Sequence, residues 1–320
     1  MNIIVTGGSG FIGTHLCKKL LMEGNTVYCV DSLQSSSRSN IEQYIGTDNF
    51  FFIEADITNE FDFVHEFKYG ENQSIHQIYH LACPASPEHY QSNPIRTLET
   101  CFIGTQNVLK LAMHFKCPVL FTSTSEIYGD PDVHPQTEQY NGNVNPLSIR
   151  SCYDEGKRIA ETMMIEYHRK HNVQIRIARI FNTYGPYLNK GDGRVISNFI
   201  CQALANRPIT VYGDGSQTRS FCYVDDTVDG LYKLMNTDDV RLCTQPVNIG
   251  NPDERTVLNC AQCIIRLTKS KSEIKYLPLP DSDPKRRCPD ITRARSLIDW
   301  NPDTLFELGL LRTIAYFEYK

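Results

Sequence analysis

The chain has 320 residues, of which 41% are hydrophobic and 22% are charged. This length and composition predict a soluble globular protein with a large domain and a smaller lobe. The 37 acidic and 32 basic residues leave a net charge of −5, which gives no reason to expect nucleic acid or an anionic membrane as a partner. No apolar run approaches the roughly 18 residues that span a bilayer, and the first residues do not resemble a signal peptide. We therefore expect a cytoplasmic protein.

Short β-branched runs alternate with longer segments of helical periodicity in the first half of the chain. The expected strands are residues 2–6, 26–30, 49–53, 77–81, 118–122 and 173–177. Apolar residues at i, i+3, i+4 and i+7 predict helices at 11–21, 94–112 and 154–167. Apolar strands that alternate with helices predict an α/β fold with a doubly wound parallel sheet, the Rossmann architecture.

The pattern loosens after about residue 180, where glycine- and proline-rich turns separate short strands and further helices. We expect residues 1–180 to form the sheet domain. Residues 181–320 are expected to form mainly a smaller lobe over the carboxyl edge of the sheet, with segments that cross back to the first domain. The 12 cysteines are scattered, and Cys260 and Cys263 form a C-x-x-C pair without a second pair or a histidine at ligand spacing. They are interpreted as free buried thiols in a reducing compartment, and no metal site is expected.

A glycine-rich turn lies between the first strand and the first helix. Gly7, Gly10 and Gly13 allow a tight turn and the close approach of a pyrophosphate to the amides at the helix N-terminus. The second strand ends in Asp31, where a carboxylate would bind the adenosine ribose hydroxyls and repel a 2′-phosphate. This pattern predicts NAD rather than NADP as the cofactor. Asp56, after the third strand, is predicted either to meet the adenine edge or to cap a helix.

Two further motifs carry acid–base chemistry. Tyr153 and Lys157 are four residues apart and share one face of a helix, where the ammonium is expected to lower the pKa of the phenol. Such a tyrosine can act as a general base on a sugar hydroxyl while a nicotinamide accepts hydride. The segment T-S-T-S-E-I-Y-G-D at 122–130 follows a buried strand and places polar side chains at the same sheet edge.

These motifs occur together with H-L-A-C-P-A-S-P, R-I-F-N-T-Y-G-P, V-Y-G-D-G-S-Q-T-R-S-F and D-P-K-R-R-C-P-D. In this combination the chain resembles the extended short-chain dehydrogenase/reductase family and, within it, the UDP-glucuronic acid decarboxylases or UDP-xylose synthases. The resemblance covers essentially the whole chain. It implies that UDP-glucuronate is oxidised at C4 by a recycled NAD, loses carbon dioxide from the 4-keto sugar, and is reduced again to UDP-xylose.

The resemblance also implies residue roles. Tyr153 with Lys157 would deprotonate the C4 hydroxyl, Thr124 would bond near it, and Ser125 and Glu126 would act at the C5 and C6 end, with Arg287 as a further catalytic and substrate-binding residue. The implied cofactor residues are Gly7, Gly10, Phe11, Ile12, Gly13, Asp31, Asp56, Ile57, Leu81, Thr100, Tyr153, Lys157 and Thr183. The implied substrate residues are Asn182, Arg194, Asn198, Tyr212, Gln217, Arg219 and Arg287.

Some assignments keep an alternative. Arg194 and Arg219 lie beside glycines and are also consistent with solvated surface groups, and Asn182 with a residue that stabilises a turn. Arg286 and Arg287 are adjacent, so an offset of one residue stays open.

The chain departs from the family at Glu99, where a lysine is usual, with Arg96 one helical turn earlier as a compensating charge. It also departs in the loop 32–36, where a glycine-containing turn is usual.

Rival functions use the same scaffold: a UDP-apiose/xylose synthase, a 4-epimerase or a 4,6-dehydratase. The Ser-Glu pair at 125–126 fits the decarboxylase best, because a dehydratase needs an Asp-Glu pair and an epimerase needs no acid there. A protein of a different class, a non-catalytic NAD-binding scaffold, would usually lose the tyrosine or the lysine. The resemblance further implies a homodimer that packs helices at about 95–114 and 152–171. The apolar stripe Leu98, Phe102, Val108 and Leu111 is equally consistent with packing on the chain's own sheet.

Overall fold

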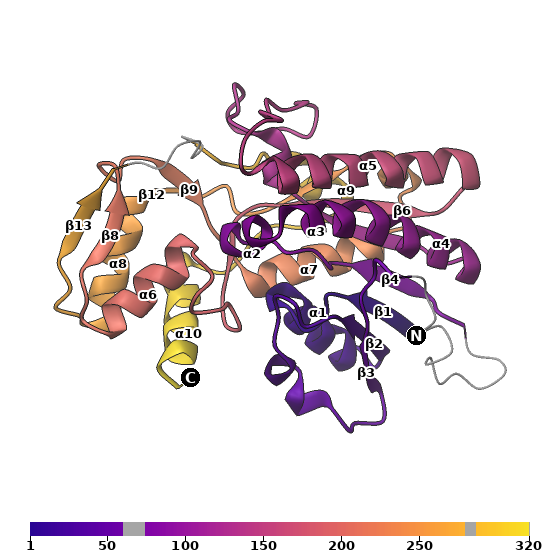
Figure 1. The fold of residues 1–320 in the computed structure, drawn as a ribbon, viewed down its shortest axis with the longest axis horizontal. Coiled ribbons are helices and arrows are strands. Elements are labelled where there is room, and N and C mark those ends of the chain that lie inside the picture. The colour runs from indigo at the N-terminus through magenta and orange to yellow at the C-terminus, as the bar shows by residue number, and fades with distance from the viewer. Residues whose placement is uncertain (60–73, 279–285, 320) are drawn as a thin grey trace.

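A computed structural model describes residues 1–59, 74–278 and 286–319. Within these residues the main layer is a seven-stranded parallel sheet with the order β11-β6-β5-β4-β1-β2-β3 (Figure 1). Its strands are β1 (Asn2–Thr6), β2 (Thr26–Asp31), β3 (Phe50–Glu54), β4 (Gln77–His80), β5 (Val119–Thr124), β6 (Ile175–Ile180) and β11 (Val247–Ile249). The six strands predicted in the first half all occur, and the doubly wound fold is confirmed.

Helices cover both faces of this sheet (Figure 1). One face packs against α1 (Phe11–Met22) and α7 (Val224–Met235), and the other against α4 (Thr105–Phe115) and α5 (Ser151–His171). Successive side chains of each strand point alternately to these two faces, because the side-chain period of a strand is two residues. Ile3 and Val5 of β1 belong to the core on the α1 side, whereas Ile4 belongs to the core on the α4 side. The strands therefore read as continuous apolar runs, as expected for a sheet buried on both faces.

The predicted helix 94–112 is divided into three parts. It consists of α3 (Pro94–Glu99), the π-helical segment η4 (Thr100–Gly104) and α4. The apolar stripe predicted along it is divided as well. Val108 and Leu111 are buried against the sheet, whereas Leu98 and Phe102 are 42% and 45% exposed. Packing on the chain's own sheet thus holds for Val108 and Leu111 only, and the homodimer stays a prediction.

A second group of elements lies beside the sheet, at the left of Figure 1. It contains α6 (Val195–Leu204), β8 (Ile209–Tyr212), α8 (Val257–Thr268), β13 (Ile274–Leu277) and α10 (Phe306–Tyr319). Strands β8 and β13 pair in parallel, and α6 and α10 pack on α8. The chain returns to the sheet through α7, β11 and α9 (Thr292–Ile298), which packs on β11.

The remaining short elements connect these layers. They are α2 (Pro87–Ser92), η5 (Ser125–Tyr128), β7 (Thr183–Tyr184), β9 (Thr218–Ser220), β10 (Cys222–Tyr223), β12 (Glu254–Thr256) and the 3-10 turns η1 (Arg38–Asn40), η2 (Glu42–Tyr44) and η6 (Val240–Cys243). Among the described residues, none of the helices combines the length and the apolar character needed to cross a membrane. Cys260 and Cys263 lie in α8 as buried free thiols, as predicted.

Candidate active site

A cavity of about 660 Å³ opens where the carboxyl ends of the strands face the second group of elements. Its position follows from the topology, because the carboxyl edge of a doubly wound sheet is where its loops converge. Most of the predicted residues line it: Gly7, Gly10, Phe11, Ile12, Gly13, Asp31, Asp56, Ile57, Leu81, Thr100, Thr124, Ser125, Glu126, Tyr153, Lys157, Asn182, Thr183, Arg194, Arg219 and Arg287. Motifs up to 280 residues apart therefore meet around one space.

Three of the predicted substrate residues do not line this cavity: Asn198, Tyr212 and Gln217. Tyr212 ends β8 and is 44% exposed. The Gln217 side-chain amide donates a hydrogen bond to the Tyr212 carbonyl oxygen at 2.7 Å. These two residues thus close their own turn in this structure, and their contact with a substrate stays a prediction.

The glycine turn between β1 and α1 leaves no room for side chains. Gly7 has a φ of +73°, and a Cβ there would lie 2.7 Å from the backbone nitrogen of Ala82. A Cβ on Gly13 would lie 2.1 Å from the Gly7 carbonyl oxygen. The turn is therefore compact, and the first residues of α1 line the cavity, where a helix N-terminus favours a pyrophosphate anion.

Asp31 is fixed at the end of β2. Its carboxylate accepts hydrogen bonds from the amides of Ser9 and Leu33 at 3.0 and 2.9 Å. The Ser36 hydroxyl donates a third bond at 2.8 Å. The serine-rich loop therefore orients the carboxylate that is predicted to meet a ribose.

Asp56 belongs to a cluster of three charges. Arg96 pairs with the Asp56 carboxylate and also donates to Glu99 at 3.0 Å. Burial opposes ionisation of Asp56, but bonds from Thr58 and Arg96 lower its pKa. Glu99, in place of the usual lysine, is thus compensated by Arg96, as the sequence suggested. The same arginine engages the Asp56 carboxylate that is predicted to meet adenine.

Tyr153 and Lys157 lie on one face of α5, beside Thr124 at the end of β5. The Lys157 ammonium lies 5.9 Å from the centre of the Tyr153 ring and donates to the Thr122 carbonyl oxygen at 2.8 Å. A lowering of the Tyr153 pKa by Lys157 stays a prediction, because in this arrangement burial has the largest effect on that pKa. Burial raises the pKa of Tyr153 well above its ordinary value, and a hydrogen bond with Thr124 opposes this only in part.

Tyr90 is a site residue that sequence reasoning missed. Its ring stacks on Tyr153 with centroids 5.0 Å apart and planes inclined by 8°. Its buried hydroxyl has no hydrogen-bond partner within the described parts of the chain, and burial raises its pKa. Tyr90 lies in the short helix α2, whose sequence P-E-H-Y-Q-S has no distinctive periodicity. The contact depends on how α2 packs against α5, which no local signal shows.

Glu126 is held between two arginines. Arg150 binds one carboxylate oxygen, and Arg287 binds the other. Burial alone would raise the pKa of Glu126, but the charges of Arg287 and Arg150 outweigh it and hold this pKa at about 2. The carboxylate is therefore ionised at neutral pH. Arg287 is almost fully buried and lines the cavity, whereas the adjacent Arg286 is exposed and does not.

Arg150 was not predicted, although it lies three residues before Tyr153. It ends the loop that leads into α5 and lines the cavity. Its burial beside Glu126 is a tertiary effect, and a single arginine in a polar loop is otherwise read as a surface group.

The comparisons with known proteins agree with this geometry. Residues 3–250 match the NAD dependent epimerase/dehydratase family. The chain is 50% identical to UDP-glucuronic acid decarboxylase 1 of Danio rerio over 315 residues, 98% of this chain and 72% of the relative. It is 51% identical to UDP-glucuronic acid decarboxylase 6 of Arabidopsis thaliana, over 97% of this chain and 87% of the relative. The chain belongs to the UDP-glucuronic acid decarboxylases.

Solved structures give the same fold. UDP-glucuronic acid 4-epimerase from Bacillus cereus, in complex with UDP-glucuronic acid and NAD, has a TM-score of 0.88 at 27% identity, over 100% of this chain and 99% of that one. UDP-glucose 4-epimerase from Thermotoga maritima, with UDP-glucose, has a TM-score of 0.89 at 28% identity, over 100% and 99%. The decarboxylase family resemblance and the NAD-binding fold predicted from sequence are therefore confirmed.

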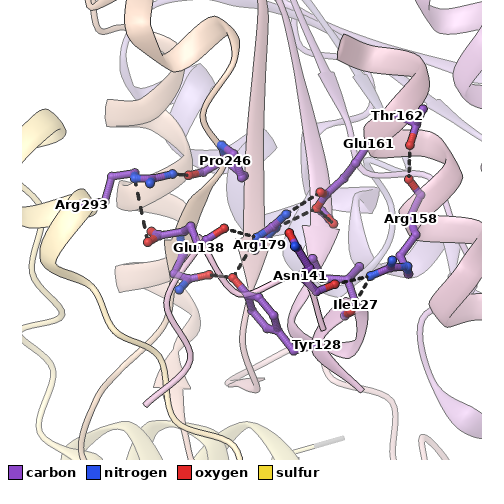
Figure 2. Close-up of polar contacts among 12 residues, drawn as sticks. Ile127, Tyr128, Glu138, Asn141, Arg158, Glu161, Thr162, Arg179, Pro246 and Arg293 are labelled. Atoms are coloured by element: carbon purple, nitrogen blue, oxygen red, sulfur yellow. Dashed lines mark hydrogen bonds and ion pairs between the residues drawn. The ribbon is translucent and has the colours of Figure 1, made fainter. Parts of the chain in front are cut away.

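A polar network holds the segment that follows β5 in this decarboxylase family member (Figure 2). Arg179 of β6 donates two hydrogen bonds to Glu161 of α5, at 3.0 and 2.8 Å. It also donates to the Tyr128 hydroxyl at 3.0 Å and to the Glu138 carbonyl oxygen at 3.1 Å. Two points of the segment between β5 and α5, Tyr128 and Glu138, are thus tied to β6 and α5 through one guanidinium.

A second arginine supports the same loop. Arg158 of α5 donates to the carbonyl oxygens of Ile127 and Asn141, at 3.1 and 2.8 Å (Figure 2). Ile127 directly follows Glu126, so this bond limits how far the glutamate backbone can move from α5. The position of Glu126 therefore depends on α5 as much as on β5.

Asp154 is a buried carboxyl beside the Glu126–arginine group. Burial and the Glu126 charge raise the pKa of Asp154 from 3.8 to about 7, against the opposing charges of Arg150 and Arg287. Its Oδ1 atom has no hydrogen-bond partner in the described part of the chain. Asp154 thus binds its proton more tightly in the folded protein than in the unfolded chain.

The protonation of Asp154 predicts a pH-dependent stability. Between about pH 3.8 and about pH 7 the folded state holds a proton that the unfolded chain has released, so the free energy of unfolding falls as the pH rises. Asp154→Asn removes this loss. We expect the Tm of the variant, relative to the parent, to be higher at pH 8 than at pH 5 by several degrees, since about 1 kcal/mol corresponds to about 2–4 °C.

Thermal unfolding at the two pH values measures this difference, and any packing cost of the amide cancels in the comparison. Glu166→Gln, at the exposed end of the same helix, is the control and should shift the Tm equally at both pH values. An equal shift for Asp154→Asn as well would contradict the raised pKa.

Breaking the Arg179 network should destabilise the fold strongly. Arg179→Met leaves the Glu161 carboxylate buried without its counterion, which typically costs about 3–5 kcal/mol. The matched control is Arg169→Met, which breaks an ion pair on the same helix whose side chains are 66% and 57% exposed; about 0–1 kcal/mol is expected. Urea unfolding of both variants measures the difference, and similar losses would refute the importance of the network.

Proposed function

We propose that this protein decarboxylates UDP-glucuronate to UDP-xylose through a UDP-4-keto sugar with a recycled NAD. The observation that carries this proposal is the ionised Glu126 held by Arg150 and Arg287 in the same cavity as Tyr153 and Lys157. The relatives named UDP-glucuronic acid decarboxylase support the substrate. The neighbour solved with UDP-glucuronic acid and NAD supports a cavity of this architecture for that pair of ligands.

The residues of the turn and of β2 fit NAD. The backbone around Gly7 and Gly13 excludes side chains, and the Asp31 carboxylate is oriented by three donors at the end of β2. Bound NAD supplies a reversible two-electron acceptor for the sugar C4. The carboxylate of Asp31 disfavours a 2′-phosphate, which supports NAD over NADP.

In this proposal Tyr153 takes the proton of the C4 hydroxyl and later returns it. Because burial keeps Tyr153 protonated, its use as a base depends on a cation that stabilises the phenolate. The Lys157 ammonium is the nearby cation on the same helix face. The stacked ring of Tyr90 holds the phenol in place and excludes water from one of its faces.

Glu126 acts here as an anion. A carboxyl with a pKa of about 2 carries no proton at neutral pH, so in this arrangement it accepts hydrogen bonds rather than donating a proton to C5. Its two arginines are suited to the C6 carboxylate and the diphosphate of the substrate, because a planar guanidinium binds either anion in two-point fashion. A substrate carboxylate that engages Arg287 would compete with Glu126 and thereby raise its pKa.

The rival enzymes of the same scaffold differ in what they release. Incubation of the purified protein with UDP-glucuronate, without added NAD, should yield carbon dioxide and UDP-xylose. UDP-galacturonate without gas would indicate a 4-epimerase, and a branched product would indicate a UDP-apiose/xylose synthase. No turnover despite bound NAD would indicate a non-catalytic scaffold.

Glu126→Gln tests the central residue. The amide keeps the size of the side chain but cannot neutralise both arginines, so we expect turnover to fall by about 100-fold or more while NAD binding persists. Carbon dioxide release and NAD titration measure the two effects. Glu166→Gln serves as the control and should retain normal turnover. Near-normal turnover of Glu126→Gln would show that the residue has no catalytic role.

We also propose that the protein forms a homodimer through the outer face of α3, η4 and α5. The apolar side chains Ile95, Leu98, Phe102 and Ile159 are exposed there, and α3, η4 and α5 are in contact with one another. Two copies of this face would bury these side chains in a four-helix arrangement. A cytoplasmic location is proposed as well, because the 12 cysteines, all within the described residues, are free thiols.

Phe102→Glu should convert such a dimer into a monomer, because it places a charge at the centre of the apolar face. Sedimentation equilibrium of the parent and the variant measures the mass in solution. Leu305→Glu is the control, since Leu305 is equally apolar and 76% exposed but lies far from α3 in the chain, next to α10. A monomeric parent protein would refute the dimer.

A further inference from the structure

Two thiols meet at the wall of the active-site cavity. Cys83 follows β4 and lines the cavity, where it is partly exposed. Cys101 lies in the π-helical segment η4 and is almost fully buried. Their sulfur atoms are 3.4 Å apart. This pair has no role in the proposed reaction.

The pair lies between the elements that form the cofactor side of the cavity. Cys101 directly follows Thr100, which lines the cavity. Its sulfur atom is so close to α5 that a Cβ on Gly156, the residue before Lys157, would lie 3.0 Å from it. On the other side Cys83 follows Ala82, whose backbone packs against the Gly7 turn. A movement of either sulfur is therefore transmitted to α5 or to the glycine turn.

The two thiols are chemically unequal. The hydrogen bond from Cys101 lowers the pKa of Cys83 to about 7, with a contribution from the Lys157 charge. The pKa of Cys101 is raised well above its ordinary value by the same hydrogen bond and by burial. Cys83 is thus the cavity-lining thiol that ionises more readily of the two, and Cys101 is the neighbouring thiol that can react with it.

We propose that Cys83 and Cys101 are a modification site, a dithiol that hydrogen peroxide oxidises reversibly to a disulfide. The Cys83 thiolate attacks one peroxide oxygen, the O–O bond breaks, and Cys83 becomes a sulfenic acid while hydroxide leaves and is protonated to water. The Cys101 sulfur then attacks the Cys83 sulfur, the S–O bond breaks, and a second water leaves with the Cys101 proton. The two sulfurs lose two electrons in total, and the peroxide gains both.

Closure changes the shape of the cavity wall. A disulfide brings the two sulfur atoms about 1.3 Å closer than they are now, so η4 moves toward the loop after β4 or this loop moves toward η4. Either movement displaces Thr100 or the backbone beside Gly7. Because a misplacement of about 1 Å can cost about 100-fold in rate, oxidation inhibits the enzyme, and a thiol reductant restores it.

The other cysteines near the site are less accessible from the cavity than Cys83. Cys17 and Cys29 also interact through their thiols, but both are fully buried and do not line the cavity. Cys152 is buried on α5, where its thiol donates to the Tyr90 carbonyl oxygen at 3.6 Å. Access for peroxide through the cavity therefore favours Cys83 as the first site of oxidation.

The disulfide can be mapped directly. The full-length protein is treated with hydrogen peroxide, its free thiols are blocked, and it is digested with trypsin without reduction. Trypsin cleaves after Arg96, so the two cysteines fall on separate peptides that only a disulfide holds together. We expect this linked pair of peptides, a loss of turnover and NAD affinity of about tenfold or more, and recovery of both with dithiothreitol. Linkage of other cysteines, or both thiols free at full inhibition, would overturn the proposal.

Two serine variants separate the disulfide from other thiol damage. Cys101→Ser should give no linked peptides, and Cys83 should instead be trapped as a sulfenic acid by a 1,3-diketone probe. Cys152→Ser is the matched control and should form the disulfide as the parent does. If Cys101→Ser is inhibited and rescued by dithiothreitol to the same extent as the parent, closure is not the cause of inhibition and the proposal fails.

Discussion

The site is organised by a single carboxylate that two arginines share. Glu126 lies just after β5, Arg150 lies just before α5, and Arg287 comes from the C-terminal part of the chain. Their mutual attraction joins three segments that have no regular secondary structure in common. Removing Glu126 leaves both arginines without their shared counterion, which is more costly than losing a surface ion pair. This carboxylate therefore links three separate parts of the cavity wall.

The surrounding scaffold is arranged so that this group has few ways to move. Arg179 and Arg158 hold the segment that carries Glu126. They donate hydrogen bonds to a side-chain hydroxyl and to backbone carbonyl oxygens of this segment (Figure 2). On the opposite side the stacked rings of Tyr90 and Tyr153 fill the space between α2 and α5. Tyr153 and Lys157 thus lie on the long helix α5, whereas Glu126, Arg150 and Arg287 lie in a short turn or in irregular segments. This is a common division of labour, because loops vary easily while the scaffold stays constant.

Much of the fold and part of the site follow from local sequence patterns. The strands are continuous apolar runs, and the Tyr153–Lys157 spacing by itself places both side chains on one helix face. What the sequence did not predict depends on packing between distant segments. Arg150 and Tyr90 are ordinary residues until α2, α5 and η5 meet. The spacing of Tyr153 and Lys157 shows that a lysine is near the phenol, but it does not show that the phenol is buried. Burial has the largest effect and raises the pKa of Tyr153. The exposure of Leu98 and Phe102 could likewise not be predicted from the helical periodicity. The π-helical segment η4 interrupts the regular α-helix between this half of the stripe and the buried half.

The late strand β11 has a consequence for how the chain acquires its structure during synthesis. It pairs with β6, and the helix α7 that precedes it covers β5 and β6 on the same side as α1. A nascent chain that has emerged only to the end of β6 has therefore made six strands of the sheet but cannot yet cover one face of two of them. The apolar side chains of this face stay accessible until about 55 further residues, to the end of α7, have emerged, and such non-local closure slows folding and exposes intermediates to aggregation. The sheet that the first half of the chain begins is thus completed only when α7 and β11, from the second half, have been made.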